Sequence, residues 1–463
     1  VDVTVSVPAI PVDITAGLTG HSKEDFRAPE APESARSVAA YATVGAIVDR
    51  AAGPAAGHAT GRTADQTASP GARLAYDRAT NSVSGAATGQ TAGLAIDLGT
   101  TSIAVSLVDL RSGEELASSV RPNPQAAFGA DIMSRLLYAT AKPRNNGTLQ
   151  RLALNAITEA FSELLKTTGL CLENVLTAVL IGNTAMHHLA LGLSVKDLSV
   201  HPYTAATLKP READIPGLPH LYAPPVVGSF VGSDLVAAAL ASGIAYGIGP
   251  ESSGTSKGAS CGASSSADKR TQLDGQSRTS LLVDVGTNSE VLLSHHGNLY
   301  ACSAPAGPAF EGGEIYQGMP GAIYEVSPEF ELGVVGGGQP RGICGSGILD
   351  AIAALVQAGV LDKNGLMHEE ELFGDRIIHE PDGSLKFRLH PDVFLTQKDV
   401  RAVQLAKGAL RCAVDTLLDE AGATPDELDA IYLAGAFGTS LRVESAVHLG
   451  LVPPIALERV HQV

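Results

Sequence analysis

The sequence predicts an α/β protein that contains one strand–turn–strand unit twice. Apolar strands that run into a glycine alternate with amphipathic helices, as they do in α/β proteins. The stretch LAIDLGTTSIAVSL at residues 94–107 has a close counterpart in LLVDVGTNSEVLL at residues 281–293. A chain of 463 residues with 44% hydrophobic residues can bury a substantial core. We therefore expect a globular protein with two related halves.

Each half continues from its repeat as a three-stranded meander. In the first half, LAIDL, IAVSLVDL and EELASSV are separated by turns at residues 99–102 and 111–113. In the second half, LLVDV, EVLLSHH and LYACSA are separated by turns at residues 286–289 and 297–298. The two meanders are equivalent, so each half presents one glycine hairpin.

Further strands and helices follow each meander. The strands LTAVLI and AIYLA lead straight into Gly182 and Gly435. Residues 149–168 and 397–421 place apolar side chains at helical spacing, and each helix ends at a glycine. The sequence Thr-x-x-Asp at residues 396–399 is a capping box that predicts the start of the second helix.

The composition argues against two classes of partner. The formal net charge is −17 and the chain has no Lys/Arg run, so we expect neither nucleic acid nor a membrane as a partner. The most apolar segment, residues 226–249, contains Asp234, and its apolar run stays short of the roughly 18 residues that span a bilayer. We expect a buried helix there, capped by Ser233 or Asp234.

The cysteines indicate a reducing compartment. The five cysteines are odd in number and far apart, with no C-x-x-C pair among them. We expect free thiols in a cytoplasmic protein, and no iron–sulfur or zinc motif can be identified. The first residue is Val1 rather than methionine, which predicts a fragment or a processed form.

The domain organisation follows from changes in composition along the chain. Residues 1–40 alternate valine with polar residues and then become rich in proline and charge, as a linker does. Residues 41–93 are rich in Ala, Gly, Thr and Ser, which predicts a small middle domain, partly of low complexity. Residues 94–280 are expected to form the first lobe, with a flexible insertion at 251–278, and residues 281–463 the second.

The residue types in the two hairpins suit a nucleoside triphosphate and its metal ion. Glycine lets the backbone approach a phosphate, and hydroxyl, amide and N–H groups donate to it. Asp97 and Asp284 are hard oxygen ligands suited to Mg²⁺, directly or through water, and are the candidate catalytic residues together with Glu290, which follows the second hairpin. One such turn alone is mostly structural; two in matched contexts indicate a binding site. The candidate phosphate-binding residues are Gly99, Thr100, Thr101, Ser102, Gly286, Thr287 and Asn288.

Two further glycine-rich turns are candidate nucleotide contacts. IYLAGAFG at residues 431–438 ends a strand in small residues that allow a flat ring to lie against the backbone. GICGSG at residues 342–347 enters a helix whose N–H groups suit an anion, although such a motif in isolation is more often a packing turn. The candidate residues are Gly345, Ser346, Gly435, Ala436, Phe437 and Gly438.

These motifs resemble a known superfamily, the acetate and sugar kinases, heat-shock ATPases and actin. DLGTT at residues 97–101 and DVGTN at 284–288 look like its two phosphate loops, and LAGAFG at 433–438 looks like its adenosine loop. The stretches RPNPQAAFGADIMSR, LIGNTAMHHLALG, SAPAGPAFEGGEIYQGMPGAI and RGICGSGILDAIA narrow the resemblance to the ATP-dependent reductive activators of corrinoid proteins. The resemblance covers about residue 94 to the end.

The resemblance implies a fold, a function and partners. It implies the actin-like ATPase fold, with two ribonuclease-H-like lobes around an ATP cleft. It also implies a homodimer that uses ATP and Mg²⁺ to return the corrinoid of a methyltransferase system, such as an O-demethylase of anaerobic metabolism, from inactive Co(II) to Co(I). In that family the electron donor is usually a [2Fe–2S] domain at the N-terminus. No ferredoxin-type cysteine cluster occurs in this chain, so we expect the cluster upstream of Val1 or in a separate donor.

Several polar residues remain open to two interpretations. Asn123, Gln125, Asp131 and Arg135 either face the cleft or a partner, or belong to a satisfied surface loop. Asn183 is a further candidate for the cleft or a partner. The pair His187–His188 suggests a cobalt ligand, but helix-surface or core histidines are commoner, and no D-x-H-x-x-G corrinoid motif occurs.

Two other functions remain as alternatives. A small-molecule kinase of the same superfamily would need a general base, for which Asp131 and Asp234 are candidates. A reactivating chaperone of a cobalamin enzyme would use the nucleotide as a switch without moving electrons.

Overall fold

The computed structural model describes residues 10–11, 75–77, 82–84, 91–244 and 278–463, apart from residues 287, 308, 311–320 and 439. The described chain falls into two compact units: the described residues between 75 and 237 form the first, and residues 10–11 together with the described residues from 238 to 463 form the second. Most of the predicted linker, middle domain and flexible insertion therefore lies outside the described residues. The short strands β2 (Ala75–Asp77) and β3 (Ser82–Ser84) pair as an antiparallel hairpin.

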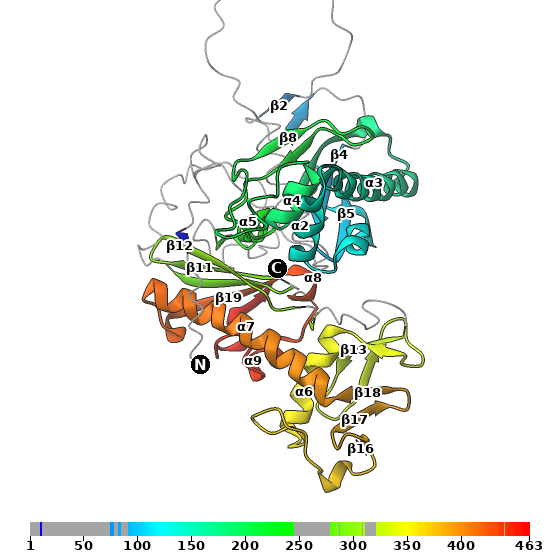
Figure 1. The fold of residues 1–463 in the computed structure, drawn as a ribbon, viewed down its shortest axis with the longest axis vertical. Coiled ribbons are helices and arrows are strands. Elements are labelled where there is room, and N and C mark those ends of the chain that lie inside the picture. The colour runs from blue at the N-terminus through cyan, green and yellow to red at the C-terminus, as the bar shows by residue number, and fades with distance from the viewer. Residues whose placement is uncertain are drawn as a thin grey trace, which may run out of the picture. The chain divides into compact units, whose positions relative to one another are not determined.

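The first unit is built on a six-stranded sheet in the order β6-β5-β4-β7-β9-β8. Figure 1 labels three of these strands, β4, β5 and β8. The predicted meander is confirmed, because β4, β5 and β6 pair antiparallel in sequence. β7 and β9 then run parallel to β4. The strands are β4 (Ala92–Leu98), β5 (Ser102–Asp109), β6 (Glu115–Pro122), β7 (Val175–Ile181), β8 (Arg211–Ala213) and β9 (Leu221–Ala223).

Four α-helices and two short 3-10 helices accompany this sheet. They are η2 (Pro124–Phe128), α2 (Ile132–Ala141), α3 (Pro143–Thr168), η3 (Leu172–Asn174), α4 (Thr184–Ala190) and α5 (Ser233–Ala241). α3 packs against β5 and β6 and buries the apolar residues that predicted it, including Ile157 and Phe161. Strands β4, β5 and β7 supply most of the other side of this core.

Two predicted helix starts are corrected by the structure. α3 begins at Pro143, six residues before the predicted start, because proline presets the first helical φ angle and the first turn is polar, with only Asn145 buried. Apolar periodicity could not detect such a turn. α5 begins at Ser233, so Ser233 and Asp234 lie inside its first turn and do not cap it.

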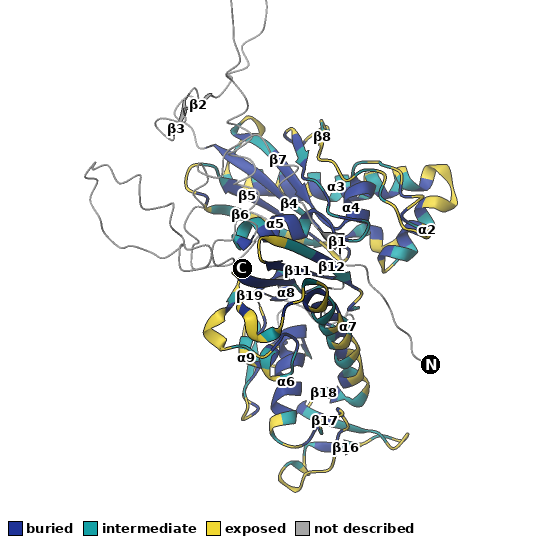
Figure 2. Cartoon of the chain, turned by 90° about the vertical axis from the view of Figure 1, so that its left-hand side faces the viewer, coloured by how far each residue is buried: buried dark blue, intermediate teal, exposed yellow. Residues whose placement is uncertain are grey.

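The second unit repeats five of these six strands in a sheet of the order β1-β12-β11-β10-β19-β20, in which the sixth strand, β1, lies at the opposite edge from β8. β10, β11 and β12 form the second predicted meander, and β19 and β20 run parallel to β10. Figure 2 shows the inner strands of both sheets as buried along most of their length. The strands are β1 (Ile10–Pro11), β10 (Thr279–Asp284), β11 (Ser289–His295), β12 (Asn298–Ala304), β19 (Leu428–Ala434) and β20 (Val460–Gln462).

Two smaller sheets and a set of helices complete the second unit. The first small sheet holds β13 (Ala322–Val326), β14 (Leu332–Val334) and β15 (Gly342–Ile343), and the second holds β16 (Ile377–His379), β17 (Leu385–His390) and β18 (Val393–Thr396). The helices are α6 (Gly345–Gln357), η6 (Glu371–Phe373), α7 (Gln397–Ala421), η7 (Pro425–Glu427), α8 (Gly435–Gly438), α9 (Val443–His448) and η8 (Leu457–Arg459).

α7 has the bounds that the sequence predicts. The Thr396 hydroxyl accepts from the Asp399 N–H over 3.2 Å, and the Asp399 carboxylate accepts from the Thr396 N–H over 2.8 Å, which confirms the capping box. Gly422 ends the helix with a left-handed φ angle of 67°. α7 contacts β11 and β12, as α3 contacts β5 and β6 in the first unit.

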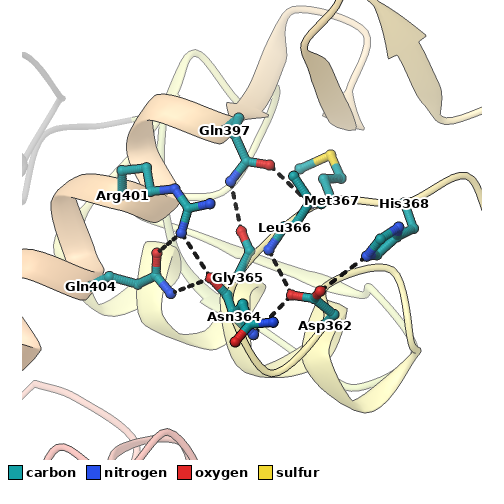
Figure 3. Close-up of polar contacts among 9 residues, drawn as sticks. All are labelled: Asp362, Asn364, Gly365, Leu366, Met367, His368, Gln397, Arg401 and Gln404. Atoms are coloured by element: carbon teal, nitrogen blue, oxygen red, sulfur yellow. Dashed lines mark hydrogen bonds and ion pairs between the residues drawn. The ribbon is translucent and has the colours of Figure 1, made fainter.

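The first turns of α7 also hold the loop that follows α6 (Figure 3). Gln397 Nε2 donates to the carbonyl oxygen of Gly365 over 2.6 Å. Arg401 and Gln404 donate to the carbonyl oxygen of Asn364 over 2.8 and 2.9 Å. The loop is thereby fixed to the helix by side chains from two successive turns.

No helix in the described part of the chain combines the length and hydropathy needed to cross a bilayer.

Candidate functional site

The first candidate phosphate loop is the turn between β4 and β5. Asp97 lies near the end of β4, and residues 99–101 form the turn. A Cβ atom added to Gly99 would lie 2.9 Å from the carbonyl oxygen of Ser102, so any other residue would force the turn open. Among the described residues, the backbone N–H groups of Gly99, Thr100 and Thr101 donate to no backbone acceptor. Such a turn can offer these N–H groups to a phosphate.

Asn123 holds this turn from one side. Its side-chain Nδ2 donates to the carbonyl oxygen of Gly99 over 2.8 Å, and its backbone N–H donates to that of Thr101 over 2.8 Å. Its Oδ1 accepts from the N–H of Gln125 and so caps η2. Asn123 is only 1% exposed, so it is a structural support of the loop.

Asn183 holds the turn from another element in the same way. Its Nδ2 donates to the hydroxyl of Thr100 over 3.1 Å, while its Oδ1 accepts from the N–H of Met186 and caps α4. In both asparagines the amide oxygen caps a helix and the amide nitrogen holds the loop. The position of the loop is therefore set by the starts of two helices.

A buried arginine lies behind these asparagines. Arg135 is fully buried; its Nε donates to the carbonyl oxygen of Gly129 over 2.8 Å, and its Nη1 lies 3.3 Å from the sulfur of Met186. Asn123 Nδ2 contacts the same sulfur at 3.8 Å. Burial lowers the pKa of Arg135 to about 10, which still leaves it charged at neutral pH.

The structure gives Gln125 and Asp131 structural contacts. Gln125 is buried, and its Nε2 donates to the carbonyl oxygen of Leu149 in α3 over 2.9 Å. Asp131 is exposed and caps α2 by accepting from the N–H of Ser134 over 2.9 Å. Hydrogen bonds from Ser134 lower the pKa of Asp131.

Close backbone contacts bring the start of α5 to the end of β4. A Cβ at Gly182 would lie 2.5 Å from the carbonyl oxygen of Leu98, and one at Gly232 would lie 2.3 Å from that of Gly182. Only glycine allows these approaches. The Ser233 hydroxyl accepts from the N–H of Gly182 over 3.2 Å, and its backbone N–H donates to the carbonyl of Gly182.

A second carboxylate therefore accompanies Asp97 in this unit. Burial, followed by the negative charge of Asp234, raises the pKa of Asp97 to about 7. Burial also raises the pKa of Asp234 to about 6. Sequence analysis proposed Asp234 only as a possible base and could not place it. The Gly-Ser-Asp sequence at the helix start was the available signal, but it does not reveal the contact between the ends of β4 and β7.

This pair of carboxylates fits a magnesium ion bound together with phosphates. Mg²⁺ commonly takes one or two carboxylates, substrate phosphate oxygens and several waters. No cluster of three or more His, Cys, Asp or Glu side chains that could hold a metal occurs among the described residues. Of the cysteines, Cys302 and Cys344 are buried, Cys171 and Cys412 are exposed, and Cys261 lies outside the described residues.

The second candidate phosphate loop lies between β10 and β11. Asp284 ends β10, and the Ser289 hydroxyl lies 3.3 Å from the N–H and 3.1 Å from the carbonyl oxygen of Gly286. Ser289 is fully buried and fixes the turn from inside. Asn288 lies within the turn, and Thr287 is outside the described residues.

The second loop contacts the predicted adenosine turn directly. Gly435 has a left-handed φ of 81°, and a Cβ there would lie 2.2 Å from Oδ1 of Asp284. The structure therefore brings together Asp284 and Gly435, which are 151 positions apart in the sequence. Glu290 lies opposite Asp284 in the antiparallel pair β10–β11 and is 3% exposed.

The remaining residues of the two glycine-rich turns make packing contacts. Phe437 is buried in the core and stacks on Phe310 with ring centroids 5.3 Å apart. A Cβ at Gly345 would collide with the carbonyl oxygen of Phe310 and with the ring of Phe437. The Ser346 hydroxyl donates to the carbonyl oxygen of Tyr324 over 2.7 Å. The carbonyl oxygen of Gly438 accepts from the side chain of Gln462 in β20. Ala436 belongs to α8, but its side chain is not among those described.

The histidine pair lies in the interior of the first unit. His187 and His188 are fully buried in α4, with ring centroids 5.6 Å apart. His188 Nδ1 is 2.8 Å from the carbonyl oxygen of Thr184. Burial is the main cause that lowers the pKa of both rings, that of His187 to about 4. They are core histidines, as the commoner interpretation predicts.

Both units match models of known protein families. Residues 92–246 match the RACo middle region, and residues 278–463 match the C-terminal domain of RACo, the ASKHA domain. The predicted α/β fold of the actin-like ATPases is thereby confirmed.

Three individual proteins that act on corrinoid proteins are also similar to this chain. The chain is 31% identical over 389 residues to the corrinoid activation enzyme RamQ of Eubacterium limosum, covering 78% of this chain and 60% of RamQ. It is 25% identical over 411 residues to the [Co(II) methylated amine-specific corrinoid protein] reductase of Methanosarcina barkeri, covering 79% and 66%. A solved reductive activator for corrinoid, iron-sulfur protein superposes with a TM-score of 0.67 at 33% identity, covering 82% of this chain and 59% of that one. The chain therefore spans about 60% of the length of RamQ and of this solved activator.

Proposed function

We propose that this chain, whose residues 92–246 and 278–463 are the middle region and ASKHA domain of a RACo-type protein, is the ATP-driven part of a reductive activator of corrinoid proteins. The observation that carries the proposal is the repeated Asp-x-Gly-Thr hairpin, present once in each unit on an equivalent sheet. The similarity to two corrinoid activators and one corrinoid reductase supports the choice of substrate.

We propose that the two hairpins bind the phosphates of ATP. The N–H groups of residues 99–101 and the hydroxyls of Thr100, Thr101 and Ser102 donate to phosphate oxygens, with Asn123 and Asn183 holding the loop. Gly286, Thr287 and Asn288 do the same in the second unit. Asp97, with Asp234 beside it, in the first unit and Asp284 in the second are the candidate Mg²⁺ ligands, directly or through water, and a bound ion would neutralise phosphate charge. Glu290 is the candidate carboxylate for orienting a water molecule.

The nucleotide acts on the protein rather than on the cobalt. A ligand shifts a conformational equilibrium only by its different affinity for the two states, so ATP must bind one arrangement of the protein more tightly than the other. The reduction itself transfers one electron from an iron–sulfur donor, and Co(II) becomes Co(I). We assign the donor to a [2Fe–2S] domain or protein outside this chain, and we propose a cytoplasmic homodimer.

The decisive experiment follows the visible spectrum of a Co(II) corrinoid protein mixed with the full-length protein and a low-potential reductant. A Co(I) band that forms only with ATP and Mg²⁺ supports the proposal. Asp284→Ala should abolish it, whereas Asp419→Ala, an exposed carboxylate on α7, should leave it unchanged. Tight ATP binding without Co(I) under any condition would contradict the proposal.

A kinase is the second candidate, because Asp234 lies beside Asp97 at the first loop. Its general base would accept the proton of a substrate hydroxyl. ATP turnover that rises severalfold with one sugar of a panel, and falls with Asp234→Asn, would favour the kinase. Turnover that is independent of every sugar would exclude it for that panel.

A further inference from the structure

One segment of the first unit carries positive charge in an otherwise acidic chain. The chain has a net charge of −17, but residues 132–158 contain four cationic residues and no Asp or Glu. This segment comprises α2 and the first half of α3. One of its cations, Arg135, is fully buried. The other three, Lys142, Arg144 and Arg151, are exposed, and we call them the basic patch.

The basic patch lines a concavity on the surface. A hollow of about 570 Å³ is lined by all three cations together with Tyr138, Asn145 and neighbouring residues. Figure 2 shows exposed stretches along the ribbon around α2. Three positive charges therefore converge on one depression instead of being spread over the surface.

No carboxylate of the described residues neutralises the basic patch. Among the described residues, none of its three cations forms an ion pair, whereas Arg121, on the same unit, pairs with both Glu159 and Glu163. Arg151 is only restrained along its own helix, with Nε 3.3 Å from the carbonyl oxygen of Gly147. The charges remain available to a ligand.

The floor of the hollow is rigid. Asn145 is 6% exposed, and its Nδ2 donates to the carbonyl oxygen of Tyr138 over 2.7 Å, which fixes α3 to α2. The Tyr138 ring packs on Phe128 with centroids 4.7 Å apart. Pro143 begins α3 and restricts the connection between the helices. The spacing of the three cations is thus largely preset.

We infer that the basic patch is a docking site for an acidic surface of the corrinoid protein, an inference that rests on the proposed function. An acidic partner is repelled by most of this chain and attracted here, so the patch orients the encounter. The hollow is open and its cations are exposed, which suits a protein surface better than a small anion that needs an enclosed site. Such contacts chiefly raise the association rate and lose strength with salt.

The test measures association of the full-length protein with the Co(II) corrinoid protein at low and high salt. The triple variant Lys142→Glu, Arg144→Glu, Arg151→Glu should associate about 10-fold more slowly at low salt and approach the wild type at high salt. The matched control, Arg111→Glu, Lys196→Glu, Lys209→Glu, changes the net charge equally on exposed residues of the same unit and should have a much smaller effect. ATP binding should be unchanged in both.

The outcomes separate the inference from the proposed function. If the wild type binds and activates the corrinoid protein but both variants associate with it at the wild-type rate, the docking site is wrong and the proposed function stands. If the wild type neither binds nor activates the corrinoid protein, the proposed function itself fails. If inorganic phosphate at constant ionic strength competes with the partner for the patch in the low millimolar range, the site belongs to a small oxyanion and the docking inference is overturned.

Discussion

The side-chain amide of Asn183 joins the start of α4 to the hydroxyl of Thr100 over 3.1 Å. The same side chain caps the helix through its oxygen. One residue therefore couples a helix terminus to the candidate phosphate loop, and the two roles can be separated by substitution.

Asn183→Ser should keep the helix and weaken nucleotide binding. Serine caps helices about as well as asparagine, but its shorter side chain has no amide to donate to Thr100. We expect ATP affinity, measured by calorimetry, to fall about 5- to 10-fold, in keeping with a lost hydrogen bond of about 1 kcal/mol. Asp131→Ser is the matched control: it replaces the N-cap residue of α2, which does not contact the loop, and should leave ATP affinity unchanged. Equal affinity of Asn183→Ser and wild type would show that the loop keeps its shape without this contact.

Gly435→Ala tests the contact between the adenosine turn and Asp284. Alanine at a φ of 81° is strained by about 1–2 kcal/mol, and its Cβ would also displace the Asp284 carboxylate. We expect destabilisation together with loss of Mg²⁺-dependent ATP binding. Gly297→Ala has nearly the same φ, 78°, with no atom within 4 Å of the added Cβ, so it isolates the backbone strain. ATP binding that survives equally in both variants would contradict the predicted role of Asp284.

Much of the fold could be predicted because it is encoded in local patterns. The meanders, Gly182 and Gly435 as strand ends, and the bounds of α7 all follow from periodicity, glycine and capping residues. The start of α3 could not be predicted, because its first turn is polar and depends on Pro143. Apolar periodicity reveals the buried face of a helix, so a helical turn that has no buried apolar face cannot be recognised from it.

The sequence predicts the two hairpin loops of the candidate site, but not the residues that hold these loops in place. The repeat identifies Asp97 and Asp284, but the proximity of Asp234 to Asp97 depends on backbone contacts at Gly182 and Gly232. Likewise Asn123 was open to a structural interpretation, and only the fold shows that its amide reaches Gly99. Long-range contacts of this kind are set by tertiary packing and are absent from any local window of sequence.

Because His187 is buried, we predict that the protein loses stability in acid. Its pKa is lowered from 6.5 to about 4, so the unfolded chain binds the proton first as the pH falls. The stabilisation from the neutral ring is complete above about pH 6.5 and is lost toward pH 4, by up to about 3 kcal/mol. Urea unfolding across this range should show a shallower pH dependence in His187→Leu than in wild type. A slope unchanged by His187→Leu would assign the pH dependence to other groups.

The capping box of α7 makes a final prediction about stability. Thr396→Ala removes the hydroxyl that accepts from the Asp399 N–H and leaves Asp399 without the threonine hydroxyl that it accepts from over 2.7 Å. We expect the free energy of unfolding to fall by about 1 kcal/mol, within the range for N-cap substitutions. The 25-residue α7 contacts β11 and β12, so the loss should appear in the cooperative unfolding of the second unit. Thr424→Ala breaks the same motif on the three-residue η7 at the surface and should cost less. Equal losses in the two variants would mean that the contribution of the cap does not depend on the helix that it starts.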